Sequence, residues 1–168
     1  MQKLWKSFLK WVAAPIAAYA ERHLVLWANS AGMCTQFKVD ILKKLHNLDS
    51  DTINLALFLA TASRGPSDAT YSTTGELAAS GNYTQGGQAV TNGTVAADGT
   101  TAHWTPTASV TWTNLTSSGA FDAAVLYNAT ASNKQISVHT FSSQSISAAD
   151  FTLTMPTDDG STGLIRIA

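Results

Sequence analysis

The sequence predicts a mainly β protein: an antiparallel β-sandwich or jelly-roll-like domain preceded by two N-terminal α-helices. Three observations lead to this fold class. Apolar residues recur every three or four positions up to about residue 50, and every second position from residue 52 onward. Turn dipeptides such as Asn92-Gly93 and Asp98-Gly99 punctuate the second part. Short apolar runs follow one another there at roughly ten-residue spacing, which is typical of sandwiches and barrels.

The first segment, residues 1–32, is predicted to be a helical arm. Three lysines lie on a helical face beside the apolar one, and Pro15 predicts a kink or a break. Because Pro15 and several alanines interrupt the apolar run, we do not expect a cleaved signal peptide. Large aromatic side chains dominate many protein interfaces, so this arm is expected to bind a partner. The residues expected to do so are Leu4, Trp5, Phe8, Trp11, Tyr19 and Trp27.

The second segment, residues 33–50, is predicted to be a short amphipathic helix packed on the domain. Thr35 is a plausible N-cap, and Asn47 with the following Asp-Ser-Asp run is expected to end the helix. The apolar face is expected to consist of Phe37, Ile41, Leu45 and Leu48. The charged residues expected to lie mostly away from that face are Lys38, Asp40, Lys43 and Lys44.

The third segment, residues 51–168, is predicted to form the β-sandwich domain. In residues 52–60, one face of the alternation is wholly apolar and the other is mixed, which favours a central strand. Further alternating sets are expected to share a face within each strand. They are Val110 with Trp112; Phe121 with Ala123, Val125 and Tyr127; Ile136 with Val138; Phe151 with Leu153 and Met155; and Ile165 with Ile167.

Charge is scarce and unevenly distributed in this chain. Only 12% of its 168 residues are charged, about half the usual fraction. We therefore expect Ser, Thr, Asn and Gln to supply most of the polar surface. Residues 1–50 contain seven basic and three acidic residues, whereas residues 51–168 contain three basic and eight acidic ones. This asymmetry predicts two parts with different partners. The basic part is not rich in arginine, so we do not expect a nucleic-acid partner.

The sequence holds no motif that predicts catalysis, a metal site or a cofactor. The four histidines are scattered without metal-ligand spacing, and Cys34 has no visible catalytic partner. Asp158 and Asp159 before Gly160 could contribute oxygen ligands to calcium, but two adjacent acids before a glycine are more often a turn. Trp104 beside Pro106 is a candidate for stacking on a sugar ring at the surface, whereas Trp112 is expected in the core.

From Met33 onward, several runs resemble a family of small structural proteins of tailed-bacteriophage virions. The resemblance rests on order and spacing, and it covers about residues 33–168. Its elements are Tyr71–Glu76, Gly81–Gly87, Trp112-Thr113, Val125–Asn128, Phe151–Pro156 and Leu164–Ala168. Members usually start near the equivalent of Met33, so residues 1–32 depart from the pattern. The resemblance implies a virion structural role and supplies no catalytic motif.

From these observations we expect a non-enzymatic virion protein that lies on the outer surface of a phage particle. The expected role is capsid decoration, or cement, anchored by the arm to the major capsid protein, with a homo-oligomer, preferably a trimer. One alternative is a tail, fibre or head-fibre adaptor that binds head–tail or tail components. A second alternative is a membrane-docking module, because Lys3, Lys6 and Lys10 beside aromatic residues suit a membrane surface, or a glycan-binding module that uses Trp104.

Overall fold

The computed structural model describes residues 29–168, and these form a mainly β, antiparallel fold with one α-helix in the described part. The predicted first helix falls in residues 1–28, outside the described residues. In chain order the elements are β1 (Gly32–Met33), α2 (Thr35–Leu42), β2 (Ile53–Leu59), β3 (Gln88–Ala89), β4 (Ala96–Asp98), β5 (Thr101–Trp104), β6 (Val110–Leu115), β7 (Phe121–Asn128), β8 (Lys134–Gln144), β9 (Ala149–Leu153) and β10 (Ile165–Ile167).

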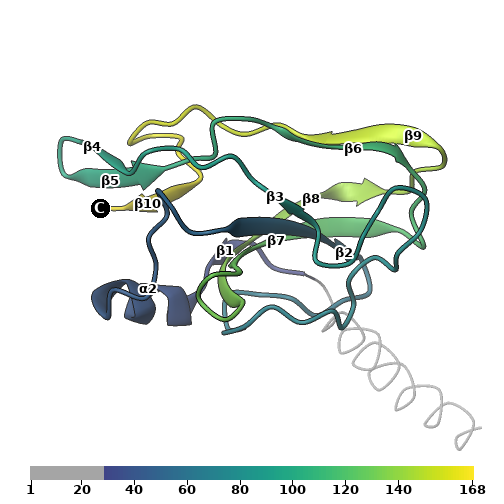
Figure 1. Cartoon of the computed structure of the whole chain (residues 1–168), viewed down its shortest axis with the longest axis horizontal. Coiled ribbons are helices and arrows are strands. Elements are labelled where there is room, and N and C mark those ends of the chain that lie inside the picture. The colour runs from purple at the N-terminus through teal and green to yellow at the C-terminus, as the bar shows by residue number, and fades with distance from the viewer. Residues whose placement is uncertain (1–28) are drawn as a thin grey trace, which may run out of the picture.

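The strands form three antiparallel sheets. The largest has five strands in the order β1-β8-β7-β2-β3, a second has the order β10-β5-β4, and β6 pairs with β9. In Figure 1 the β6–β9 pair and the β10-β5-β4 sheet lie along one side of the five-stranded sheet, and α2 lies at the end occupied by β10. The mainly β class and the antiparallel pairing that the sequence predicts are therefore confirmed.

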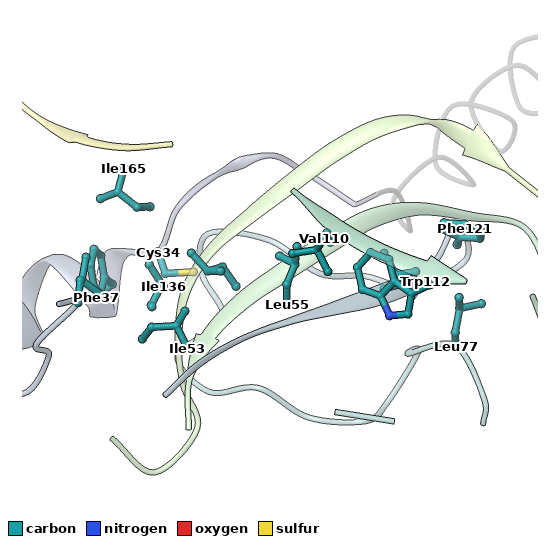
Figure 2. Close-up of a cluster of buried hydrophobic side chains, with 14 of the residues drawn as sticks. Cys34, Phe37, Ile53, Leu55, Leu77, Val110, Trp112, Phe121, Ile136 and Ile165 are labelled. Atoms are coloured by element: carbon teal, nitrogen blue, oxygen red, sulfur yellow. The ribbon is translucent and has the colours of Figure 1, made fainter. Parts of the chain in front are cut away.

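The main core fills the space between these layers. Leu55 and Leu57 of β2 lie in one cluster with Trp112 of β6, and all three side chains are fully buried. Figure 2 shows Leu55 and Trp112 within this cluster. Trp112 therefore lies in the core as predicted, and it packs against Phe151 of β9 with ring centroids 6.0 Å apart. The alternation predicted for residues 52–60 is also confirmed, because Ala56 and Phe58 point to the opposite face of β2.

Residues 60–87, here called the β2–β3 cover, run along the edge of β2 and place Ala62 and Tyr71 in the cluster on its opposite face. The central group of the cover is Glu76, a buried carboxylate that accepts hydrogen bonds from the Tyr71 hydroxyl, the Tyr83 hydroxyl at 2.7 Å and the Gly86 N–H at 2.7 Å. Burial, followed by the hydrogen bond to Glu76, raises the pKa of both tyrosines, so their hydroxyls remain donors at neutral pH. The same network reaches the sheet, because Leu57 N–H of β2 donates to the Tyr83 hydroxyl at 2.9 Å and the Tyr127 hydroxyl of β7 donates to the Gly86 carbonyl at 2.8 Å.

The end of the cover approaches β2 so closely that only glycine fits there. Gly87 has φ +69°, and a Cβ at this position would lie 2.0 Å from the Leu55 carbonyl oxygen. Glycine adopts positive φ without the steric penalty of other residues. The Gly86-Gly87 pair, a turn signal in the sequence, therefore brings the chain into register to form β3 against β2.

Two predicted strand faces are wrong because β-bulges interrupt them. Phe121 was expected to share a face with Ala123, but the two residue steps between them in β7 lie opposite a single step of β2, and Phe121 points into the main core. Ile136 and Val138 were expected together, yet a second shift opposite Leu126 and Tyr127 places Ile136 in the main core and Val138 on the other face. A bulge adds one residue to one strand, so every side chain beyond it changes face.

The second helix is shorter than predicted, and Cys34 rather than Thr35 occupies its N-cap position. It ends because Lys44 adopts φ 59°, while Leu45 N–H donates to the Asp40 carbonyl and Lys44 N–H donates to the Ile41 carbonyl. This pair of bonds is the Schellman arrangement, which stops a helix. Leu48 is buried, but Leu45 is 43% exposed and lies past the helix end.

Residues 29–32, assigned to the arm by sequence, bind the body. Asn29 donates from its side-chain amide to the Leu59 carbonyl at 3.0 Å and to the Asp122 carboxylate at 2.6 Å. Ser30 N–H donates to the Arg64 carbonyl, and Gly32 pairs with Val138 in β1. A deletion that spares the body should therefore stop at residue 28.

Candidate docking surface

Helix α2 is fastened to the sheet by a buried ion pair that its sequence pattern does not indicate. Asp40 was expected to face away from the domain, but its side chain is only 2% exposed and lies 2.9 Å from the Lys134 ammonium of β8. Gln36 donates to the other carboxylate oxygen at 2.8 Å. Burial alone would raise the pKa of Asp40, but the hydrogen bonds from Lys134 and Gln36 hold it below its usual value. Asp40 is therefore ionised at neutral pH.

This attachment leaves a hollow between α2 and the β10-β5-β4 sheet. Its volume is about 480 Å³, and the turn after α2 closes one side. Figure 1 shows α2 and these three strands facing each other at one end of the molecule. Most of the residues that line the hollow are apolar: Phe37, Ile41, Leu48, Val95, Ala102, Trp104, Ile165 and Ile167. A concave apolar site of this size is typical of binding sites for apolar groups.

A second hollow of about 520 Å³ adjoins the first, because Ile41 and Ile167 line both. Leu42 is 86% exposed and Ile167 is 45% exposed, both high values for large aliphatic side chains. Val95 is 47% exposed on the far rim of the first hollow. We call the two hollows and their rims the α2–β10 surface, defined by Lys38, Ile41, Leu42, Lys44, Val95, Arg166 and Ile167. Contiguous exposed apolar surface of this kind marks an interaction site.

The charged side chains that line the α2–β10 surface are all positive, and Ala168 also lines the second hollow. Lys44 lines the first hollow, while Lys38 and Arg166 line the second. No aspartate or glutamate side chain lines either hollow among residues 29–168. Neither Lys38 nor Lys44 forms an ion pair within that part of the chain. The surface therefore combines apolar hollows with positively charged side chains.

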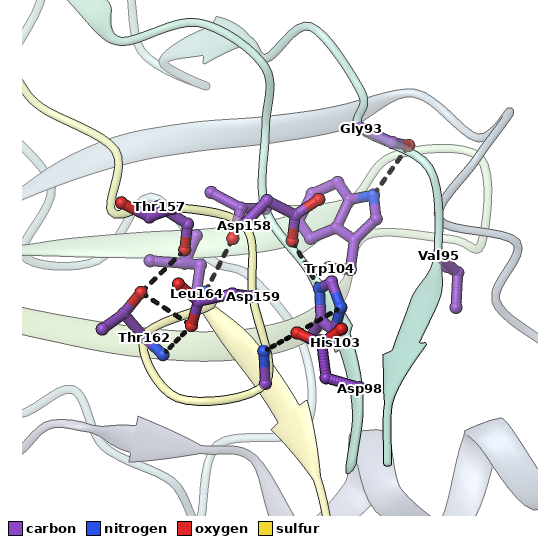
Figure 3. A network of polar contacts seen from close by, with 12 residues as sticks. Gly93, Val95, Asp98, His103, Trp104, Thr157, Asp158, Asp159, Thr162 and Leu164 are labelled. Carbon is purple, nitrogen blue, oxygen red and sulfur yellow. Dashed lines mark hydrogen bonds and ion pairs between the residues drawn. The ribbon is translucent and has the colours of Figure 1, made fainter.

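Trp104 is the wall of the first hollow, and the prediction that it stacks on sugars at the surface is wrong. Only 1% of this residue is exposed, and its indole Nε1 donates to the Gly93 carbonyl at 3.1 Å (Figure 3). Its ring packs in the main core with Ile165 of β10. A ring that stacks on a sugar must present a face to solvent, and the pairing of β5 with β10 removes this one.

A histidine between two carboxylates supports the sheet behind the hollow. His103 Nδ1 lies 2.9 Å from an Asp158 oxygen, and its Nε2 lies 3.5 Å from Asp98 (Figure 3). The turn predicted at Asp158-Asp159-Gly160 is present, because Asp159 accepts hydrogen bonds from the N–H groups of Ser161 and Thr162. These backbone bonds lower the pKa of Asp159. The carboxylates thus fix a loop against β5, and among residues 29–168 no group of His, Cys, Asp and Glu is arranged to hold a metal.

His46 forms part of the floor on the α2 side. Its ring packs edge-on against Phe37 with centroids 4.8 Å apart, and its Nδ1 lies 3.0 Å from the Asn128 amide nitrogen. Burial lowers the pKa of His46 despite Asp40, whose carboxylate lies 3.9 Å away. The His46 side chain in the floor of the hollow is therefore uncharged at pH 7. Cys34 is also buried, which raises the pKa of its thiol and agrees with the inert role expected for it.

The residues of the α2–β10 surface were not among the site residues predicted from sequence. All the arm residues predicted to bind a partner, Leu4, Trp5, Phe8, Trp11, Tyr19 and Trp27, lie outside the described residues. Leu42 carried a weak signal, since it is an aliphatic residue beside Lys43 and off the Phe37–Ile41 face. Val95 and Ile167 carried none, because their exposure depends on how β4 and β10 pair with β5.

Comparison with protein-family models, with curated proteins and with solved structures gave no match. Among residues 29–168, no helix has both the length and the apolar character needed to cross a membrane.

Proposed function

We propose that this chain is a non-enzymatic structural protein of a bacteriophage virion, most specifically a capsid decoration or cement protein. The observation that carries the proposal is the α2–β10 surface, where Leu42, Val95 and Ile167 expose apolar area around two hollows. Such a surface is unfavourable in water and stable when a partner covers it. In a particle, the partner would be the major capsid protein or another virion component.

The sequence resemblance suggests the kind of assembly, a phage particle, in which this surface would meet its partner. Its motifs fall on elements of the described fold: Trp112-Thr113 in β6, Val125–Asn128 in β7 and Leu164–Ala168 around β10. A jelly-roll-like arrangement is part of the proposal, and the antiparallel sheets on either side of one apolar core support it. The arm residues Leu4, Trp5, Phe8, Trp11, Tyr19 and Trp27 are proposed as the anchor on the particle.

The buried polar groups support a structural role rather than catalysis. Glu76 is saturated by two tyrosines and a backbone N–H, and Asp40 is paired with Lys134. Catalytic acids and bases usually have a cavity beside them and a pKa suited to proton transfer. These carboxylates instead hold one element of the fold to another.

Two measurements test the proposal together. Quantitative mass spectrometry of purified particles should find the protein at hundreds of copies, as expected for decoration, and as a trimer or another symmetric homo-oligomer in solution. A few to a few dozen copies would instead favour the tail, fibre or head-fibre adaptor. Absence from particles would overturn the virion role altogether.

The second measurement is truncation. A variant that lacks residues 1–28 keeps Asn29 and β1, so it should fold with unchanged far-ultraviolet circular dichroism but bind particles weakly. A full-length variant with Trp5→Ala and Trp11→Ala is the matched control, because it removes the aromatic anchors and keeps the length. Full occupancy by both variants would show that the arm is not the anchor. Flotation of a peptide of residues 1–28 with anionic liposomes tests the membrane alternative.

A further inference from the structure

We propose that the α2–β10 surface binds an acidic segment of a partner protein, with large apolar side chains that enter its two hollows. The inference rests on the docking role proposed above for the same surface, and it specifies the chemistry of the partner. It follows from three properties of the surface: its shape, its positively charged side chains, and the like charge that it shares with residues 1–28 of this chain.

The shape defines where the apolar anchors go. The first hollow lies between Phe37 of α2 and Ile165 of β10, and Trp104 closes its wall. The second is also lined by Ile41 and Ile167 and is bordered by Met33. Because the two hollows share these two lining residues, one continuous segment can place one anchor in each. Fully desolvated anchors of this kind usually supply most of the energy of an interface.

The charge defines the flanks of the segment. Lys44 lines the first hollow and Lys38 and Arg166 line the second, whereas no acidic side chain of residues 29–168 lines either one. The Arg166 guanidinium also donates a hydrogen bond to the Ser161 carbonyl. The Asp40 carboxylate, on the inner side of the helix, is already paired with the Lys134 ammonium. Complementary charge favours encounter and fixes the register of the bound segment. Asp or Glu side chains beside the anchors would provide this complement.

The same charges argue against the arm as the occupant. Residues 1–28 contain Lys3, Lys6, Lys10 and Arg22 against the single acid Glu21. Its aromatic residues would suit the hollows, but its lysines would face Lys38, Lys44 and Arg166, and like charges at an interface are unfavourable. The arm of the same copy or of a second copy is therefore the less favoured ligand. The arm and the α2–β10 surface would then meet different regions of the particle.

The test is a selection of displayed random 12-residue peptides on the full-length protein, with the Ile167→Ser variant for counter-selection. We expect enriched peptides to combine two Leu, Ile, Met, Phe or Trp residues with Asp or Glu. Their affinity should fall roughly fivefold in a Lys38→Gln/Lys44→Gln variant, and it should weaken as salt rises. The matched control is Thr140→Asp/Ser143→Asp on β8, which makes the same change in net charge at exposed positions away from the surface. This control should bind the peptides normally.

Several results would overturn the inference. Enrichment of neutral or basic peptides would do so, as would an affinity that the two lysine substitutions leave unchanged. Tighter binding of a synthetic peptide of residues 1–28 would assign the surface to the arm. Self-association in sedimentation that Ile167→Ser abolishes would assign it to a second copy, and failure to enrich any peptide dependent on Ile167 would remove the site. All of these outcomes leave particle copy number unaffected, so they are distinguishable from failure of the proposed function.

Discussion

The β2–β3 cover and the α2–β10 surface lie on the same scaffold but treat their apolar and polar groups in opposite ways. In the cover, Tyr71 stacks on Tyr127 with centroids 4.0 Å apart, and Glu76 receives three hydrogen bonds. At the α2–β10 surface, Leu42 and Ile167 remain exposed beside lysines without partners among residues 29–168. The first region stabilises the molecule, whereas the second is the surface that we propose a partner covers.

The largest expected effect is in the cover. Glu76→Ala removes the acceptor of the buried Tyr83 hydroxyl, of the half-buried Tyr71 hydroxyl and of the Gly86 N–H. We expect the free energy of unfolding to fall by about 4 kcal/mol, as measured by urea denaturation. Glu76→Gln is the matched control and should lose less, because it keeps one acceptor oxygen. Equal losses in the two variants would show that the hydrogen bonds do not hold the cover.

The next effect concerns the attachment of α2. Lys134→Met keeps the aliphatic stem and leaves Asp40 as a buried charge without its ammonium. We expect a loss of about 3 kcal/mol in the free energy of unfolding, since an unpaired buried charge is strongly destabilising. Adding Asp40→Asn should restore much of this loss in the double variant. A double variant no more stable than Lys134→Met would contradict the ion-pair argument.

Acid should loosen the α2 end. The pKa of His46 is lowered by burial, so its contribution to stability is present above the ordinary pKa of about 6.5 and is lost as the pH falls toward the folded value. We expect the Tm to fall between pH 7 and pH 5, and His46→Gln to reduce that fall. His139, whose pKa burial lowers to about 4, acts in the same direction. A His46→Gln/His139→Gln variant with the slope of the parent protein would refute this account.

A smaller effect, of opposite sign, is expected at the end of α2. Lys44 holds φ 59° at the position where glycine is favoured, so Lys44→Gly should raise the free energy of unfolding by about 0.5–1 kcal/mol. Lys43, with φ −93°, provides the control, because Lys43→Gly gains no relief and should be slightly destabilising. Thermal denaturation of the two variants at one pH compares them. The prediction fails if both shift the Tm in the same direction.

The smallest effect on stability is expected at the docking surface itself. Leu42 is 86% exposed, so Leu42→Ser should change the free energy of unfolding by no more than about 0.5 kcal/mol. Phe37→Ala on the same helix should lose about 3–4 kcal/mol, because Phe37 is fully buried. Particle binding should weaken in Leu42→Ser all the same. A large loss of stability in that variant would mean that Leu42 serves the fold rather than a partner.

Local pattern predicted much of the fold and little of the site. The alternation in residues 52–60 and the buried Trp112 followed from the sequence, because side-chain period and apolar character are properties of neighbouring residues. The exposure of Ile167 and the burial of Trp104 did not follow. Both depend on the pairing of β10 with β5, whose residues are about sixty positions apart. The arm residues predicted as the site lie outside the described residues, and their role stays a prediction.

The sequence by itself determined the antiparallel β class, the change of period near residue 52 and the basic front of the chain. Tertiary structure decided where the faces change, because the bulges at Phe121 and Ile136 arise from the match between whole strands. It also decided that Asp40 is buried and that Leu42 is not, although both lie on one short helix. Period sets which residues share a face, but only packing between distant segments sets which face is covered.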